Sequence, residues 1–139
     1  RSFWDILKLA EGPVVASHSN CRALCDVRRN LTDEQLRAIR DTGGVIGVNV
    51  YHGFVHAEPR MQTAAMLARH AAHIAETIGP EHVACGFDFC EYFGPGNEGC
   101  EGMESCAQTG NFFFELERLG FSAAERQGIA SENLLRVLE

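Results

Sequence analysis

The stretch VIGVNV, residues 45–50, is apolar on both faces and rich in β-branched residues. Such an uninterrupted apolar run is typical of a strand in a parallel sheet that is covered on both faces, whereas strands of an open antiparallel sheet alternate apolar and polar residues. Two further runs, residues 14–16 and 82–89, have the same apolar character. The sequence therefore predicts about three parallel strands.

Helical patterns lie between and after these runs. Thr32 is placed to begin a capping box, and residues 61–78 carry apolar side chains at helical spacing. The sequence predicts helices over residues 32–42 and 61–78, and further helices from residue 113, from Ser122 and from Ser131. Alternation of strands and helices at this spacing indicates right-handed crossovers, so the predicted fold class is α/β.

The composition argues against two classes of binding partner. The chain of 139 residues carries 19 acidic against 12 basic residues, a net charge of −7. This balance argues against binding to nucleic acid or to an anionic membrane. No apolar run approaches the roughly 20 residues that cross a bilayer, and the N-terminus lacks a signal-peptide pattern. We therefore expect one folding unit in a soluble, cytoplasmic protein with no nucleic-acid or membrane partner.

Long polar loops follow the predicted strands. They cover residues 17–30, 49–59 and 88–110, while the loops that lead into the strands are short. In parallel α/β folds the functional face lies at the carboxyl ends of the strands. His18, Asn49 and Asp88 follow or end the three runs, so we expect them at one rim of the sheet.

His18 and Asp88 are the first candidates for chemistry at this rim. An imidazole nitrogen of His18 can bind a metal or transfer a proton, but a histidine in this position can also cap backbone groups in the turn. The carboxylate of Asp88 can take a proton, bind a metal or pair with an ammonium group, or it can brace the loop. The residues alone leave both interpretations open.

Arginines and further histidines are the next candidates. Arg28 and Arg29 lie in the loop after the first strand, where a guanidinium can bind a ligand carboxylate or bond to loop carbonyls. His70 and His73 are three residues apart on a predicted helix, a spacing that can share a metal. Their position in mid-helix favours a packing role, and His52 remains a minor candidate near the rim.

Five segments of the chain resemble the C-terminal part of the membrane dipeptidase family, also called the renal dipeptidase family, and especially its bacterial members. In the order of the family they are PVVASHSNCRALCDVRRNLTDEQLRAI, GGVIGVNV, HVACGFDF, EGMES and ENLLRVLE. They span nearly all of the chain, and the block from SHSN to RRN is long and specific.

The resemblance implies a fold, an activity and roles for three residues. The fold would be the C-terminal portion of a (β/α)8 TIM-type barrel, with residues 1–139 as a single partial domain. The activity would be zinc-dependent hydrolysis of dipeptides, with two zinc ions in a complete site. On this chain the resemblance implies that His18 is a zinc ligand and that Arg29 binds the free carboxylate of the substrate. It also implies that Asp88 is a catalytic residue that faces the substrate amine.

The chain departs from the family pattern in two ways. Cys90 replaces the second aspartate of the usual Asp-Phe-Asp-Gly, and the loop that follows is rich in glycine. The family's other metal ligands, an early His-x-Asp pair, a bridging glutamate and a further histidine, belong to the first half of the barrel and have no match here. About three of eight strands cannot close a barrel, so we expect a homo-oligomer or association with the missing half.

Two alternatives to the dipeptidase remain. The chain can be a non-catalytic partial barrel that acts as an oligomeric or binding module. It can also be a cysteine-centred redox or metal protein, for which the candidates are Cys85, Cys90, Cys100 and Cys106. The cysteine spacing does not match the paired C-x2-C pattern of a zinc knuckle, and we expect free thiols.

Overall fold

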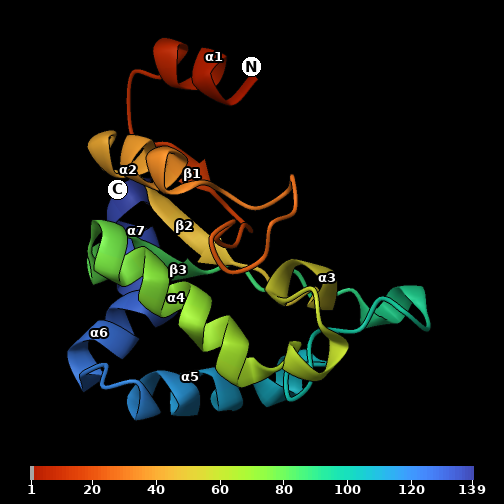
Figure 1. Ribbon diagram of the computed structural model, residues 1–139. Coiled ribbons are helices and arrows are strands. Elements are labelled where there is room, and N and C mark those ends of the chain that lie inside the picture. The colour runs from red at the N-terminus through yellow and green to blue at the C-terminus, as the bar shows by residue number, and fades with distance from the viewer. Residues whose placement is uncertain (1) are drawn as a thin grey trace.

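A sheet of three parallel strands forms the centre of the molecule (Figure 1). The computed structural model describes residues 2–139, so Arg1 lies outside the described residues. The strands are β1 (Val15–Ala16), β2 (Val45–Val48) and β3 (Val83–Cys85), in the spatial order β1-β2-β3. Val45 of β2 lies opposite Val15 of β1. The predicted α/β class with three parallel strands is confirmed.

Two strands end earlier than the apolar runs predicted. The strand predicted over residues 45–50 ends at Val48, because the backbone N–H of Asn49 donates to Oδ1 of Asn20 at 2.9 Å. The strand predicted over residues 82–89 ends at Cys85. Beyond it the backbone turns, and Asp88 adopts a φ of 61°, in the left-handed region that few non-glycine residues occupy.

Two helices pack together against the sheet. α2 (Asp33–Asp41) begins at the predicted capping box of Thr32. α4 (Ala64–Ile78) begins after Thr63, whose side chain caps it, so the predicted start at residue 61 was wrong. Residues Pro59–Met61 form a separate turn of 3-10 helix instead. α4 contacts α2, β2 and β3, and its apolar stripe supplies much of the core.

The other helices surround this unit (Figure 1). They are α1 (Ser2–Leu9), α3 (His52–Val55), α5 (Thr109–Arg118), α6 (Ala123–Gln127) and α7 (Asn133–Leu138), with further 3-10 turns at Pro80–His82, Glu91–Phe93 and Cys106–Gln108. α5 packs along α4 and buries Phe112 and Leu116. Within residues 2–139, no helix has both the length and the apolar character that crossing a bilayer requires.

The C-terminal segment is more continuous than the sequence predicted. α6 begins at the predicted cap, Ser122, but no new helix begins at Ser131. A π-helical segment, Gly128–Glu132, joins α6 to α7 instead. The side chain of Asn133 holds this segment in place, because its Nδ2 donates to the carbonyls of Pro80 and Val83 at 2.9 and 2.7 Å. The segment therefore lies against the amino end of β3, away from the polar rim.

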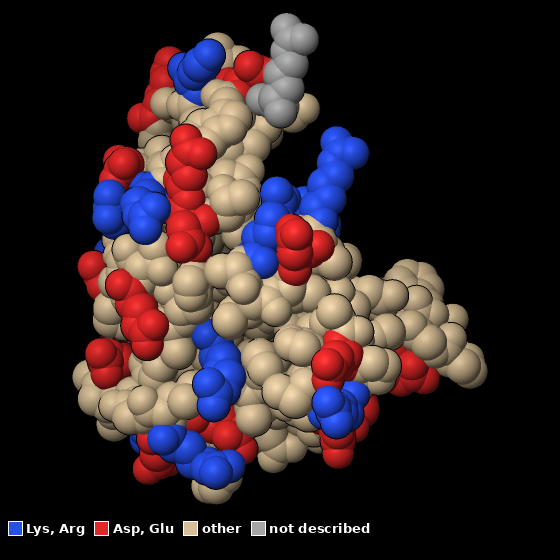
Figure 2. Space-filling model, in the orientation of Figure 1, with Lys and Arg blue, Asp and Glu red and all other residues tan. Residues whose placement is uncertain are grey.

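The surface in Figure 2 carries interspersed acidic and basic side chains and no single large patch of either sign. α1 stands apart at one end of the molecule, and none of its residues is buried (Figure 1). Its Ile6 and Leu9 are 59% and 82% exposed, and Val15 on the neighbouring edge strand β1 is 39% exposed. Apolar side chains are thus exposed beside this edge of the sheet.

Candidate active site

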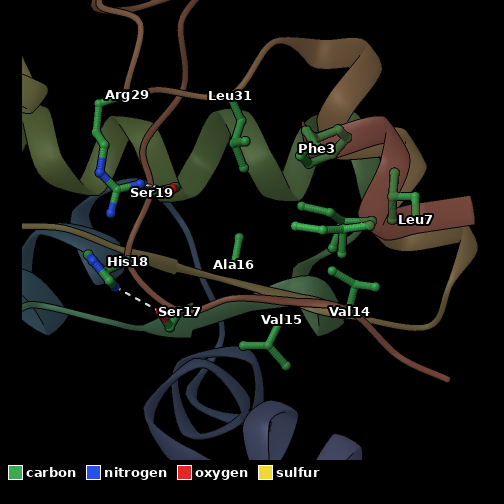
Figure 3. A pocket seen from close by; sticks show the side chains of 12 residues that line it. Phe3, Leu7, Val14, Val15, Ala16, Ser17, His18, Ser19, Arg29 and Leu31 are labelled. Carbon is green, nitrogen blue, oxygen red and sulfur yellow. Dashed lines mark hydrogen bonds between the residues drawn. The ribbon is translucent and has the colours of Figure 1, made fainter. Parts of the chain in front are cut away.

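His18 lies at the carboxyl end of β1, where its position in the sequence predicted it. Oγ of Ser17 lies 2.7 Å from Nδ1 of His18, and the two side chains meet in this way in Figure 3. When Nδ1–H donates to such an oxygen, the lone pair of Nε2 is available to bind a metal or accept a proton. This nitrogen is the one that lies nearest Asp88.

Asp88 reaches the same rim from the loop that follows β3. Its Oδ2 lies 4.0 Å from Nε2 of His18, and the two side chains are 48% and 40% exposed. Nδ2 of Asn49 donates a hydrogen bond to the same oxygen at 3.2 Å. The left-handed backbone of Asp88 turns the chain at this point. Three strand ends therefore bring an imidazole, an amide and a carboxylate together.

Arg29 approaches the rim from the loop after β1. Its Nη1 donates to Oγ of Ser19 at 3.2 Å, and its guanidinium lies 6.0 Å from the ring centre of Phe54. Arg29 and His18 line a cavity of about 350 Å³, whose apolar lining includes Phe3 and Leu7 of α1 (Figure 3). The three side chains named from the sequence, His18, Arg29 and Asp88, thus gather at one rim.

Asn20 is a structural residue that the sequence analysis missed. It is fully buried, and it exchanges two hydrogen bonds with the backbone of Asn49: its Oδ1 accepts from the N–H and its Nδ2 donates to the carbonyl, both at 2.9 Å. Nδ2 also lies 3.3 Å from the carbonyl of Phe54. The available signal was an asparagine in each of the loops that follow two neighbouring strands. Asn20 joins the loops that carry His18 and Asn49.

His70 has the packing role that its position predicted. The ring is fully buried; its Nδ1 accepts a hydrogen bond from the N–H of Cys21 at 3.0 Å, and its Nε2 lies 2.8 Å from the carbonyl of Val55. Burial lowers the pKa of His70 to about 4. His73 instead contacts Oδ1 of Asp33 at 2.8 Å. The two histidines therefore have separate partners and share no metal in this arrangement.

The six cysteines are free thiols, as expected. Burial raises the pKa values of Cys85 and Cys100 to about 12, so both are uncharged at neutral pH. Cys90 is the thiol nearest the candidate site, with its Sγ 3.8 Å from Oδ1 of Asp88. Loss of hydration and the negative charge of Asp88 raise the pKa of Cys90 as well. Cys85, Cys90 and Cys100 therefore lack the lowered pKa of a reactive cysteine.

The donor atoms at the rim can supply part of the ligand set of a metal site. His18 offers a free imidazole nitrogen, and Asp88 offers a carboxylate beside it. Within residues 2–139, however, no group of three or more histidine, cysteine, aspartate or glutamate side chains is arranged to hold a metal ion. Zinc sites in proteins usually have three or four protein ligands. Further ligands would therefore have to come from outside this arrangement.

The fold is that of metallopeptidases in solved structures. A metallo peptidase from Rhodobacter sphaeroides, liganded with a phosphinate mimic of the dipeptide L-Ala-D-Ala, has a TM-score of 0.85 and 28% sequence identity; the match covers 98% of this chain and 38% of that one. The metallo peptidase described as dipeptidase AC has a TM-score of 0.86 and 29% identity, over 99% of this chain and 40% of that chain.

The sequence comparison identifies the family. The family model of membrane dipeptidases, peptidase family M19, matches residues 1–139, and the chain belongs to this family. Dipeptidase ataJ of Aspergillus terreus is 32% identical over 97% of this chain, and the uncharacterized dipeptidase C3A11.10c of Schizosaccharomyces pombe is 31% identical over 94%. The chain spans about a third of the length of these relatives, 32% and 31% respectively. The resemblance stated from the sequence motifs is therefore confirmed.

Proposed function

We propose that the protein hydrolyses dipeptides with zinc at this rim, and that its three strands are a portion of a (β/α)8 barrel. The observation that carries the proposal is the 4.0 Å approach of Nε2 of His18 to Oδ2 of Asp88, with Arg29 at the adjoining cavity. Membership of the membrane dipeptidase family supports the reaction class. A dipeptide is a zwitterion, and this rim offers a cation for its carboxylate and an anion for its ammonium group.

In the proposed mechanism Arg29 binds the C-terminal carboxylate of the dipeptide. Its guanidinium is held by one hydrogen bond, from Nη1 to Ser19, so its other N–H groups can form a two-bond contact with a carboxylate. The ring of Phe54 lies 6.0 Å from the guanidinium, at the outer limit of a cation–π contact. This contact selects substrates that have a free carboxylate and places the scissile bond towards His18.

His18 would hold the metal through Nε2, with Nδ1–H donating to Ser17. The bound zinc would supply an activated water and polarise the scissile carbonyl. The 2.7 Å contact with Ser17 fixes the ring and its tautomer, which is the role that outer hydrogen bonds have around metal-binding histidines.

Asp88 would bind the substrate ammonium group and carry a proton to the leaving amine. Hydrolysis adds water across the peptide bond, so the proton that water gives up must reach the departing nitrogen. The carboxylate of Asp88 is half exposed, oriented by Asn49 and close to His18, which places it to accept and return that proton.

We also propose that the site is completed by further barrel elements packed on this unit. The support is that relatives are about three times as long, and that apolar α1 and β1 side chains are exposed beside the edge strand. These elements can belong to the same polypeptide, to a separate one or to a second copy. They would supply the metal ligands that His18 and Asp88 alone do not provide.

The test is zinc content and dipeptide hydrolysis by the full-length protein, compared between wild type, His18→Ala and His73→Ala. His73 is the matched control, because it also bonds to a carboxylate but lies on α4, distant in sequence from the rim loops. The proposal expects loss of hydrolysis and of bound zinc in His18→Ala alone. A wild-type protein without bound zinc or turnover would contradict it and favour the non-catalytic binding module.

A further inference from the structure

A second cavity is lined by Asp88 and is distinct from the cavity that contains His18. Its volume is about 280 Å³, and it lies between the loop after β2 and the loop after β3. The lining residues are Val50, Tyr51, Phe54, Phe93 and Gly99, with Asp88, Cys90, Asn97 and Glu98 as the polar members. Whole small-molecule sites occupy about 300–1,000 Å³, so this volume, at the lower limit of that range, is large enough for one side chain of a ligand.

The two loops that form the cavity are joined by backbone pairing. Tyr51 pairs with Gly99 in an antiparallel bridge, and the N–H of Cys100 donates to the carbonyl of Val50 at 2.8 Å. Val50 in turn donates to the carbonyl of Phe87 at 3.0 Å. A Cβ at Gly99 would overlap the carbonyl of Met103, so the backbone at Gly99 packs closely against the backbone at Met103. The walls are thus held in place without a ligand.

The cavity combines aromatic walls with negative charge. Tyr51, Phe54 and Phe93 contribute the apolar surface, and the ionisable carboxylates among the lining residues are Asp88 and Glu98. Oε2 of Glu98 accepts a 2.7 Å hydrogen bond from the N–H of Gly96, which orients the carboxylate. The lining includes no lysine, arginine or histidine. An acidic side chain that entered would lose hydration and meet like charge.

We propose that this cavity binds the side chain of the N-terminal residue of the dipeptide, favouring large apolar and aromatic side chains and discriminating against acidic ones. The inference rests on the proposed dipeptidase function and extends it to substrate class. Asp88 links the cavity to the candidate active site, because it lines this cavity and its Oδ2 also lies 4.0 Å from Nε2 of His18. A substrate whose ammonium group bonds to Asp88 carries its first side chain on the adjacent carbon, within reach of the cavity.

Two neighbouring aromatic residues provide a matched test. Tyr92 and Phe93 lie in the same 3-10 turn, with ring centres 4.4 Å apart, and both are largely exposed, at 74% and 69%. Phe93 lines the cavity and Tyr92 does not. Substitution of either by alanine removes an exposed aromatic ring from the same turn, so stability should change similarly in the two variants.

The experiment compares kcat/KM of the full-length, zinc-loaded protein for Phe-Ala, Gly-Ala and Glu-Ala. In the wild type we expect Phe-Ala to exceed Glu-Ala by at least about tenfold, from apolar burial and charge repulsion. Phe93→Ala should lower the ratio of Phe-Ala to Gly-Ala about fivefold, because part of the apolar wall is removed. Tyr92→Ala should leave this ratio at the wild-type value. Glu98→Gln should raise Glu-Ala relative to Gly-Ala about threefold.

The outcomes separate the inference from the function on which it rests. Hydrolysis with a Phe-Ala to Gly-Ala ratio that Phe93→Ala leaves unchanged, or that Tyr92→Ala lowers equally, would overturn the assignment of the cavity and leave the dipeptidase proposal intact. A wild-type preference for Glu-Ala would overturn the assignment in the same way. Absence of turnover for all three dipeptides would overturn the proposed function, and this inference with it.

Discussion

Asn49 and Asp88 are joined by a 3.2 Å hydrogen bond from Nδ2 to Oδ2, and that same oxygen lies 4.0 Å from Nε2 of His18. The amide therefore decides which way the half-exposed carboxylate faces. Asn49 itself is fully buried, and Asn20 holds its backbone on both sides through two 2.9 Å bonds. The orientation of the candidate catalytic carboxylate is thus set from inside the fold.

This relationship predicts the effect of Asn49→Leu. The variant keeps a side chain of similar size but leaves Asp88 without its donor, so the carboxylate can rotate away from His18. We expect hydrolysis to fall about 10- to 100-fold, the usual effect of removing a residue that orients an active-site group. Steady-state kinetics with one dipeptide measures it. Asn111→Leu is the control, because Asn111 is exposed and its side chain bonds to the carbonyl of Gly102 and not to a residue of the candidate site; an equal loss there would contradict the prediction.

Arg29 and Arg28 allow a test of carboxylate recognition. Both are exposed neighbours in the loop after β1, but only Arg29 lines the cavity that contains His18. Arg29→Met should raise KM for a dipeptide and lower kcat/KM about 10- to 100-fold, because a charge-assisted contact of about 1.5–3 kcal/mol is lost. The same variant should lose the preference for a dipeptide over its C-terminal amide. If Arg28→Met rather than Arg29→Met abolished that preference, the assignment of Arg29 would be wrong.

His70 predicts a pH dependence of stability. Its pKa of about 4 in the folded state lies below the ordinary 6.5, so the unfolded chain takes up a proton between these values and the native protein does not. Stability should therefore be complete above pH 6.5 and fall as the pH decreases towards 4, by about 3 kcal/mol from this group. Urea unfolding across this pH range measures the loss.

The comparison for this prediction is His70→Asn. Asparagine keeps a hydrogen-bond acceptor for the N–H of Cys21 but cannot be protonated. The variant should be less stable than the wild type at neutral pH and should lose less stability between pH 6.5 and 4. Parallel pH curves for the two proteins would show that His70 does not carry the effect.

Gly86 and Gly110 predict opposite effects of alanine. A Cβ at Gly86 would overlap the carbonyl of Ser17, which lies between Gly47 and Gly86 where the strands meet. Gly86→Ala should destabilise the protein by about 3 kcal/mol, because backbone cannot move aside as a flexible side chain can. Gly110 lies in α5 with open space around it, so Gly110→Ala should stabilise by about 0.5–1 kcal/mol. Urea unfolding of both variants tests the pair; a mild effect at Gly86 would contradict the close approach.

The sequence was sufficient for the parts of the fold that depend on local pattern. The apolar run at residues 45–50 indicated a covered strand, and Thr32 and Ser122 marked helix starts that the structure has. Local pattern failed where distant contacts decide the backbone. The local pattern predicts a helix start at Ser131, but the helical backbone of Gly128–Glu132 runs through that residue. Hydrogen bonds from Asn133 to the carbonyls of Pro80 and Val83 hold the segment in this position.

The sequence by itself determined the family and which polar residues lie in the loops after the strands, because motifs and periodicity are local properties of the chain. Only the tertiary structure decided how those residues face one another. The 4.0 Å approach of His18 to Asp88, the orientation of Asp88 by Asn49 and the aromatic cavity beside them all join residues far apart in sequence. Such contacts depend on strand register and on buried bonds such as those of Asn20, and no single segment of the chain contains that information.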